Sequence, residues 1–298
     1  FQAWDADSYE GLGSWAWGGP ADGKLKDGMD DFGAYWEYND IPVGTEVGFI
    51  AVTWNGTEGP NFDKKLTGDV KIDPSAIVAG ETVHVYVFEG AETKDDHPDY
   101  FIARNDAMNL LVVYFDPSDN YEDNIGVHAW NGWIDVPAEW GTPFEFQRAG
   151  KTVAGIEVKA LMLHNDNNLE GGLLVYAGDD ATKKTGDVKL SDSGVTKTGD
   201  VGVAYVVSKG SAYTVNDNVF YNDYQAFVDE AFTFKLMPFS LTETGPDGTY
   251  AVDPYTVIVK TSATVASPYP TATDKDAARA QIENWFMIFE KGSTTPLA

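Results

Sequence analysis

The feature that most constrains the fold is a repeated segment with alternating aromatic residues. The segment Tyr9–Trp17 (YEGLGSWAW) is echoed by Tyr121–Trp130 (YEDNIGVHAW). Because successive side chains of an extended strand point to opposite faces, Trp15 and Trp17 should emerge on the same side, roughly 6–7 Å apart. Each copy therefore predicts a β-strand with a row of aromatic side chains on one face.

Further matches follow in the same order along the chain. They pair 32–38 with 140–146, 47–52 with 158–163, 67–72 with 185–190, and 83–85 with 201–203. The spacing between matched positions drifts little, as loop-length differences between related domains would produce. The repeat predicts two related modules, in which the opening strand 109–115 of the second module is truncated in the first.

Turn residues and strand patterns predict an all-β chain of tandem antiparallel β-sandwich modules with a small Ig-like C-terminal β domain. The predicted domains are 1–98, 99–224 and 225–298, with the polar stretch 93–99 as the first linker. In the last domain, 232–236 and 256–260 alternate as strands, and the capping-box-like start Thr273–Asp276 predicts one short helix to about Trp285. This segment is short for an Ig-like domain, so it can instead complete the second module.

Composition excludes several function classes. The 298 residues include 47 Asp and Glu against 20 Lys and Arg, a net charge of −27. This charge repels nucleic acid and anionic bilayers, which favours a neutral or cationic partner, although it also serves solubility. The absence of cysteine excludes disulfides and thiol chemistry. No apolar run approaches the roughly 20 residues of a membrane span, and Phe1 suggests an interior fragment of a longer chain.

Motifs for metal or nucleotide chemistry do not occur. The four histidines lack HExxH or paired spacing, and there is no P-loop, GxSxG or GxGxxG. The loops 116–120 and 164–168 offer oxygen atoms that suit calcium, but without EF-hand spacing. No cofactor is predicted, and calcium is the one ion that these loops would suit.

The first module resembles carbohydrate-binding module family 41, the α-glucan-binding β-sandwiches attached to bacterial pullulanases. The matching segments are 9–18, 31–36, 47–50, 67–70 and 85–90. The resemblance covers residues 1–95. It implies non-catalytic binding of amylose, amylopectin, pullulan or glycogen by two tryptophans, which fall on Trp15 and Trp17.

The chain departs from the family pattern in two places. Leu12 stands where the family often has another tryptophan, a change expected to affect core packing more than binding. The family also uses a lysine and an aspartate after the strand that begins at Val47, and residues 54–63 have no lysine at the expected place. Asn61 or Asp63 could replace the aspartate, and Trp54 could add a third aromatic wall.

The second module resembles a divergent starch-binding module of the kind found beside family 41 modules in bacterial surface amylases and pullulanases. His128 replaces Trp15, Trp130 matches Trp17, and Trp133 lies three residues further on. These three residues are its candidate sugar contacts. The other large aromatics, Trp36, Trp140, Phe144 and Trp285, are interpreted as core.

The predicted function is binding of α-glucans by aromatic stacking, which targets an attached amylase or pullulanase of the same parent chain to its substrate at the cell surface. The apolar face of a pyranose stacks on an aromatic ring while its hydroxyls remain free for hydrogen bonds. Each stack contributes about 1 kcal/mol, so a single site should bind with a Kd of roughly 10⁻³ to 10⁻⁶ M. Two tethered sites would raise avidity by about 10²–10⁴.

Two other classes of function are weighed. A glycoside hydrolase needs two carboxylates roughly 5–10 Å apart, and 47 acidic residues satisfy that by chance. Hydrolases that act on starch use barrels of about 250 residues or more with alternating strands and helices, so independent catalysis is not predicted. A cell-surface adhesion or scaffold array that binds proteins would show an apolar patch without spaced aromatics. The tryptophan-bearing strands favour sugar.

Overall fold

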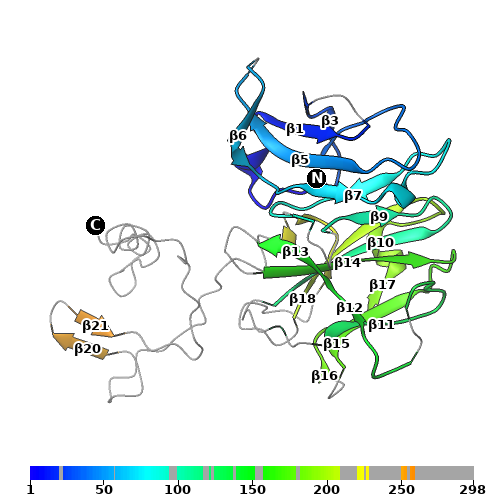
Figure 1. The fold of residues 1–298 in the computed structure, drawn as a ribbon. Helices are drawn as coiled ribbons and strands as arrows, with labels where there is room; N and C mark the ends of the chain where they lie inside the picture. The colour runs from blue at the N-terminus through cyan, green and yellow to red at the C-terminus, as the bar shows by residue number, and fades with distance from the viewer. Residues whose placement is uncertain are drawn as a thin grey trace. The chain divides into compact units, whose positions relative to one another are not determined.

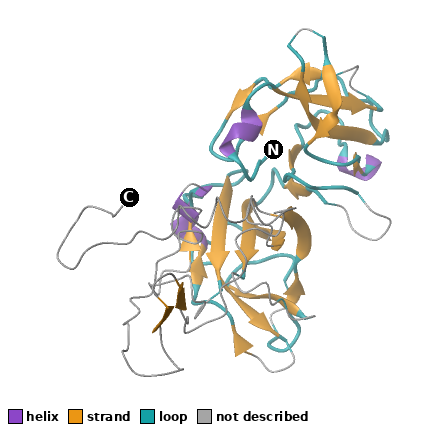
Figure 2. Cartoon of the chain, turned by 90° about the vertical axis from the view of Figure 1, so that its left-hand side faces the viewer, coloured by secondary structure: helices purple, strands orange, loops and turns teal. Residues whose placement is uncertain are grey.

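The computed structural model describes 13 parts of the chain: residues 1–19, 23–56, 58–93, 99–116, 121, 124–136, 139–151, 157–178, 182–208, 220–224, 226–227, 250–253 and 256–258. The chain divides into two compact units, Phe1–Pro238 and Phe239–Ala298. Strands dominate the described residues, and the helical segments among them are short turns (Figure 2). The prediction of an all-β fold is confirmed.

The second unit contains one described strand pair, β20 (Tyr250–Asp253) with β21 (Thr256–Ile258). The strand predicted at 256–260 coincides with β21. The strand predicted at 232–236 and the helix predicted from Thr273 lie outside the described residues, as does most of the linker at 93–99. The limits of the three domains, 1–98, 99–224 and 225–298, stay a prediction.

The first sheet of unit 1 presents one apolar face to a core. Its strand order is β2 (Lys24–Leu25), β1 (Leu12–Trp17), β5 (Val47–Trp54) and β6 (Pro60–Lys65), with β7 (Val70–Ile72) also paired to β5. The buried face includes Leu12, Phe49 and Ala51, which alternate with outward-facing residues. Smaller pairs join β3 (Gly28–Met29) to β4 (Ala34–Tyr35) and β8 (His84–Tyr86) to β9 (Phe101–Ala103). Short 3₁₀ turns are η1 (Ala6–Tyr9) and η2 (Pro74–Ala76).

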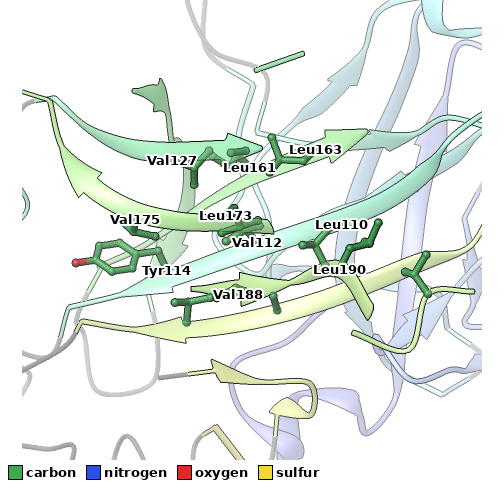
Figure 3. Packing of buried hydrophobic residues seen from close by; sticks show 14 of the residues in the cluster. Leu110, Val112, Tyr114, Val127, Leu161, Leu163, Leu173, Val175, Val188 and Leu190 are labelled. Carbon is green, nitrogen blue, oxygen red and sulfur yellow. The ribbon is translucent and has the colours of Figure 1, made fainter. Parts of the chain in front are cut away.

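The second sandwich packs two five-stranded sheets face to face. One sheet has the order β13 (Gln147–Lys151), β14 (Glu157–Asn165), β10 (Met108–Phe115), β18 (Val201–Val207) and β19 (Phe220–Tyr221). The other has the order β12 (Phe144–Glu145), β11 (Ile125–Trp130), β15 (Gly172–Ala177) and β16 (Thr182–Lys183), with β17 (Val188–Lys189) beside β15 and the turn η3 (Leu190–Ser193) after it. Between the sheets, Leu110 and Val112 of β10 meet Val127, Leu173 and Val175 (Figure 3).

Strand β10 is buried along its whole length because both of its faces pack. The side chains of Leu111, Val113 and Phe115 lie on the face opposite the sandwich core, in a cluster that includes Trp4 and Phe88. In Figure 1, β10 and β14 accordingly lie between the sheet of β1 and β5 above and that of β11 and β15 below. The two modules share a hydrophobic core.

One pair of strands departs from the predicted antiparallel pattern. Strands β10 and β18 run parallel, in register from Asn109↔Val201 to Phe115↔Val207. Gln2 and Phe88 form a parallel bridge in the first module. Parallel neighbours need a long crossover connection, and here the intervening chain forms the strands of the opposite sheet as well as β13 and β14 of the same sheet. Gln2 thus occupies in the first module the position that β10 occupies in the second.

Strand pairing confirms one part of the sequence repeat and corrects two others. In the first module, β5 pairs with β1 and β7, with Gly48 opposite Lys71; in the second, β15 pairs with β11 and β17, with Gly172 opposite Lys189. The match of 67–72 with 185–190 is therefore structural. The counterpart of 47–52 is β15 rather than 158–163, and that of β12 is β2 rather than 32–38. Those two alignments were therefore wrong. They arose because apolar and aromatic segments resemble one another in sequence, whichever strands they pair with in the sheet.

The repeated threonine has the same role in both modules. The hydroxyl of Thr67 accepts a hydrogen bond from the backbone N–H of Ala51 at 3.0 Å, and that of Thr185 accepts one from Val175 at 2.9 Å. Both threonines are buried. Each hydroxyl satisfies an amide of a central strand that has no water within reach.

Replacing Thr185 by valine should lower the free energy of unfolding by about 1–3 kcal/mol, because the buried amide of Val175 loses its acceptor. Thr185→Ser keeps the hydroxyl and is the matched control. Urea unfolding of both variants measures the difference. Equal stability of the two variants would contradict the assigned role of the hydroxyl.

Candidate functional site

The two tryptophans of β1 lie on the outer face of their sheet. Ser14 and Ala16 are buried on the core side, whereas Trp15 and Trp17 are half-buried on the opposite side, as the period-two spacing predicts. Trp17 faces Gly48 across the strand pair. A Cβ atom at Gly48 would lie 1.8 Å from Cε2 of Trp17, so glycine there allows the indole to lie directly over the β5 backbone.

Trp15 extends this outer face toward β6. It pairs with Ile50, and the edge of Phe62 meets its ring at 5.7 Å with an interplanar angle of 80°. Phe62 is 47% exposed, and the ammonium group of Lys65 lies 5.6 Å from the centre of its ring. Neighbouring aromatic surfaces thus lie on one side of the sheet.

Trp54 lies at the end of β5 on the same face, at even spacing from Gly48 and Ile50. Its ring covers Gly13, where a Cβ atom would lie 2.2 Å from the indole nitrogen. The nitrogen is buried and has no hydrogen-bond acceptor among the described residues. Trp54 is thus half-buried beside the other two tryptophans, with its ring edge turned into the sheet.

The two polar candidates of the first module lie on β6. The amide of Asn61 donates to the Asn55 side chain at 3.4 Å and accepts from the backbone N–H of Asp63 at 3.1 Å, which fixes the hairpin. Asp63 is exposed. Their predicted roles in sugar binding stay predictions. Leu12, in contrast, is fully buried, so its substitution for tryptophan concerns the core.

The second module repeats the glycine-supported indole. Trp130 faces Gly172, where a Cβ atom would lie 2.4 Å from the indole, and His128 faces Leu174. Both side chains are half-buried on the outer face of β11. Trp133 lies elsewhere: its indole N–H donates to the carbonyl of Gly172 at 2.9 Å, and its ring packs against the sandwich core.

Trp140 is on this outer face, and its interpretation as a core residue was wrong. It is 45% exposed and stacks on Tyr176, with ring centres 4.5 Å apart and planes at 25°. Its ring also meets His128 at 4.9 Å and 73°. Trp36 and Phe144 do pack against cores, and Trp285 lies outside the described residues.

The electrostatic environment keeps the His128 imidazole neutral near pH 7. Burial lowers the pKa of His128, and the positive charge of Lys183 lowers it further. Its Nδ1 atom has no hydrogen-bond partner within the described part of the chain. The histidine therefore acts as an uncharged ring between Trp130 and Trp140, both of which it contacts.

The described residues contain no group of three His, Cys, Asp or Glu side chains placed to hold a metal ion. In the loop 164–168, which the sequence suggested for calcium, Asn165 donates to the carbonyl of Asn131 and His164 bonds to Asp135. Residues 117–120 of the other loop lie outside the described residues. None of the described helices is long and apolar enough to cross a membrane.

The first of these faces lies in a segment that matches a known family. Residues 1–94 match the bacterial pullanase-associated domain. The matched segment contains Trp15, Trp17 and Trp54. This part of the chain is therefore similar to an accessory domain that accompanies a carbohydrate-degrading enzyme. No curated protein matched the chain.

A similar solved structure is described as the product complex of a multi-modular glycogen-degrading pneumococcal virulence factor, SpuA. It is 15% identical in sequence, with a TM-score of 0.29, and the alignment covers 75% of this chain. This chain spans 21% of that protein.

Substituting alanine for Gly48 should displace the Trp17 indole, because the added Cβ atom occupies its place on β5. Trp17→Ala removes the conflict, so Gly48→Ala should alter stability and tryptophan emission in the wild-type background and have a smaller effect in Trp17→Ala. Fluorescence and thermal melting of the four combinations measure this coupling. Additive effects would contradict the direct contact.

The lowered pKa of His128 makes its contribution to stability depend on pH. The unfolded state binds a proton below about pH 6.5, before the folded state does, so stability falls as pH decreases through that range. His128→Gln should reduce this loss, whereas His84→Gln, at an exposed histidine of β8, is the matched control. Melting temperatures at pH 5.5 and 7.5 give the comparison. An identical pH dependence in wild type and His128→Gln would refute the assignment.

Proposed function

We propose that the first module binds α-glucan chains without catalysis, as a carbohydrate-binding module of family 41. The observation that carries the proposal is the pair of half-exposed indoles of Trp15 and Trp17 on the outer face of β1, inside the segment similar to the pullanase-associated domain. Phe62 and Trp54 extend the same face.

The physical basis is stacking on a rigid surface. Gly48 and Ile50 support the two indoles from below, so little side-chain freedom remains to be lost on binding. A pyranose that stacks on each ring gains about 1 kcal/mol beyond the buried area. The resulting affinity is modest, and a polymer with many repeats compensates for that through avidity.

The charge of the chain suits a neutral ligand. A net charge of −27 repels polyanions but leaves an uncharged polysaccharide unaffected. Starch, amylopectin, pullulan and glycogen are uncharged. A surface for protein partners would present an apolar patch, whereas here flat rings are spaced along a strand.

The same proposal extends to the setting of the chain. An amylase or pullulanase domain elsewhere in the parent protein would act on the polymer that this module holds. An enzyme that acts on polymers from the surroundings of the cell works outside the cell, so we infer an extracellular protein attached to the cell surface. The similarity of residues 1–94 to a pullanase-associated domain supports the presence of such an enzyme domain in the parent protein.

Affinity electrophoresis in gels that contain amylopectin, pullulan, cellulose or xylan tests the proposal. The chain should be retarded by the two α-glucans alone. Trp17→Ala should weaken the first site about fivefold or more, since one stack of about 1 kcal/mol is lost. Tyr35→Ala is the matched control, because Tyr35 is 38% exposed in the same module but lies on β4. Equal retardation of Trp17→Ala and wild type would reject the first site.

A further inference from the structure

We propose that the second module has its own α-glucan site, in which Trp140 and Trp130 form the stacking surface and His128 is a positioning residue for Trp140. The inference deepens the proposed function and rests on it. Trp140 lies in the loop before β12. The proposal gives it the stacking role that Trp15, a strand residue, has in the first module.

The two outer faces share one backbone framework. Trp130 lies on Gly172 as Trp17 lies on Gly48. The lysines of the adjacent strands also correspond: Lys65 pairs with Val52, and Lys183 pairs with Tyr176. The position of Trp15 is taken by His128, whose smaller ring offers less area for stacking a sugar.

The Trp140 side chain is exposed to solvent although one of its faces is packed. One face of its indole packs on the buried Tyr176, yet 45% of the residue is exposed to solvent. His128 contacts both Trp140 and Trp130, so this apolar surface belongs to a group of neighbouring rings rather than to an isolated residue. In the first module, the exposed Phe62 meets Trp15 in the same edge-to-face manner in which Trp140 meets His128.

Contacts within the protein hold Trp140 in place without a ligand. Tyr176 supports its ring, and the hydroxyl of Tyr176 accepts a hydrogen bond from the backbone N–H of Gly141 at 3.2 Å. His128 contacts the ring from the side. A stacking surface that is already rigid loses little conformational entropy when it binds, which is the requirement for a weak sugar site.

A hydrogen-bond donor beside the rings suits a polyhydroxylated ligand. The ammonium group of Lys183 lies 5.9 Å from the centre of the Trp140 ring and can donate hydrogen bonds to sugar hydroxyls. The ligand class is therefore a glucan chain, stacked on Trp140 and Trp130 and hydrogen-bonded by Lys183.

The test uses the full chain, affinity electrophoresis in amylopectin gels, and the variants Trp17→Ala, Trp140→Ala and their combination. Trp17→Ala should keep part of the retardation, and the double variant should lose it. Trp140→Phe preserves an aromatic ring and should bind better than Trp140→Ala. Ile134→Ala is the control, because Ile134 is 46% exposed in the same module and lies in the loop before β12. Thermal melting of each variant monitors folding.

The positioning role of His128 has a separate readout. His128→Ala should weaken the residual binding of the Trp17→Ala chain about threefold or more, since each aromatic contact contributes about 0.5–1.5 kcal/mol. It should have a smaller effect in a chain that carries Trp17→Ala and Trp140→Phe, in which some binding remains and the smaller ring offers His128 less contact. An equal loss in both backgrounds would contradict positioning through Trp140.

The outcomes separate the two proposals. Complete loss of retardation in Trp17→Ala alone would reject the second site and support the first. Retardation lost in Trp140→Ala but unchanged in Trp17→Ala would support the second site and reject the first. A double variant that is retarded as strongly as Trp17→Ala would also reject the second site. A wild-type chain that no glucan retards would reject both.

Discussion

The burial of β10 on both faces is the interaction on which the rest of unit 1 depends. Its alternate residues pack into two different cores, one inside the second sandwich and one against the first module. Each large apolar side chain buried in this way contributes about 1.5–3 kcal/mol. The polar groups that enter the shared core are paired: the hydroxyl of Tyr205 donates to the Gln2 side chain at 2.9 Å. Burial raises the pKa of Tyr205 well above its usual value, so the hydroxyl remains a donor.

With the cores directed inward, the outer sheets are left to display their aromatic residues. Glycine supports the indole in each module, at Gly48 and at Gly172. The second ring has a different origin in each module: β1 supplies Trp15, and the loop before β12 supplies Trp140. The two copies thus share a backbone framework, while the second aromatic ring comes from different elements.

The sequence predicted the local features of this structure and missed the non-local ones. Alternation alone was enough to put Trp15 and Trp17 on one face, and the repeated Thr-Gly-Asp-Val-Lys marked equivalent strands. Pairing partners depend on the whole sheet, so the apolar run 158–163 was matched to the wrong strand and the parallel pair was not foreseen. Trp140 lies on the outer face because it stacks on Tyr176, a residue of another strand. No local sequence pattern reveals that contact.

The shared core also bears on how the two modules can be studied separately. The segment similar to a known domain ends at residue 94, which makes that point an obvious place to cut the gene. Trp4 and Phe88, whose ring centres are 5.0 Å apart, would then lose the strands of the second module that cover them. The side of β10 that packs against these two rings would be exposed in the other fragment. A half-chain cut there would expose a broad apolar surface and tend to aggregate. Point substitutions on the outer faces avoid this artefact, since they leave the junction between the modules intact.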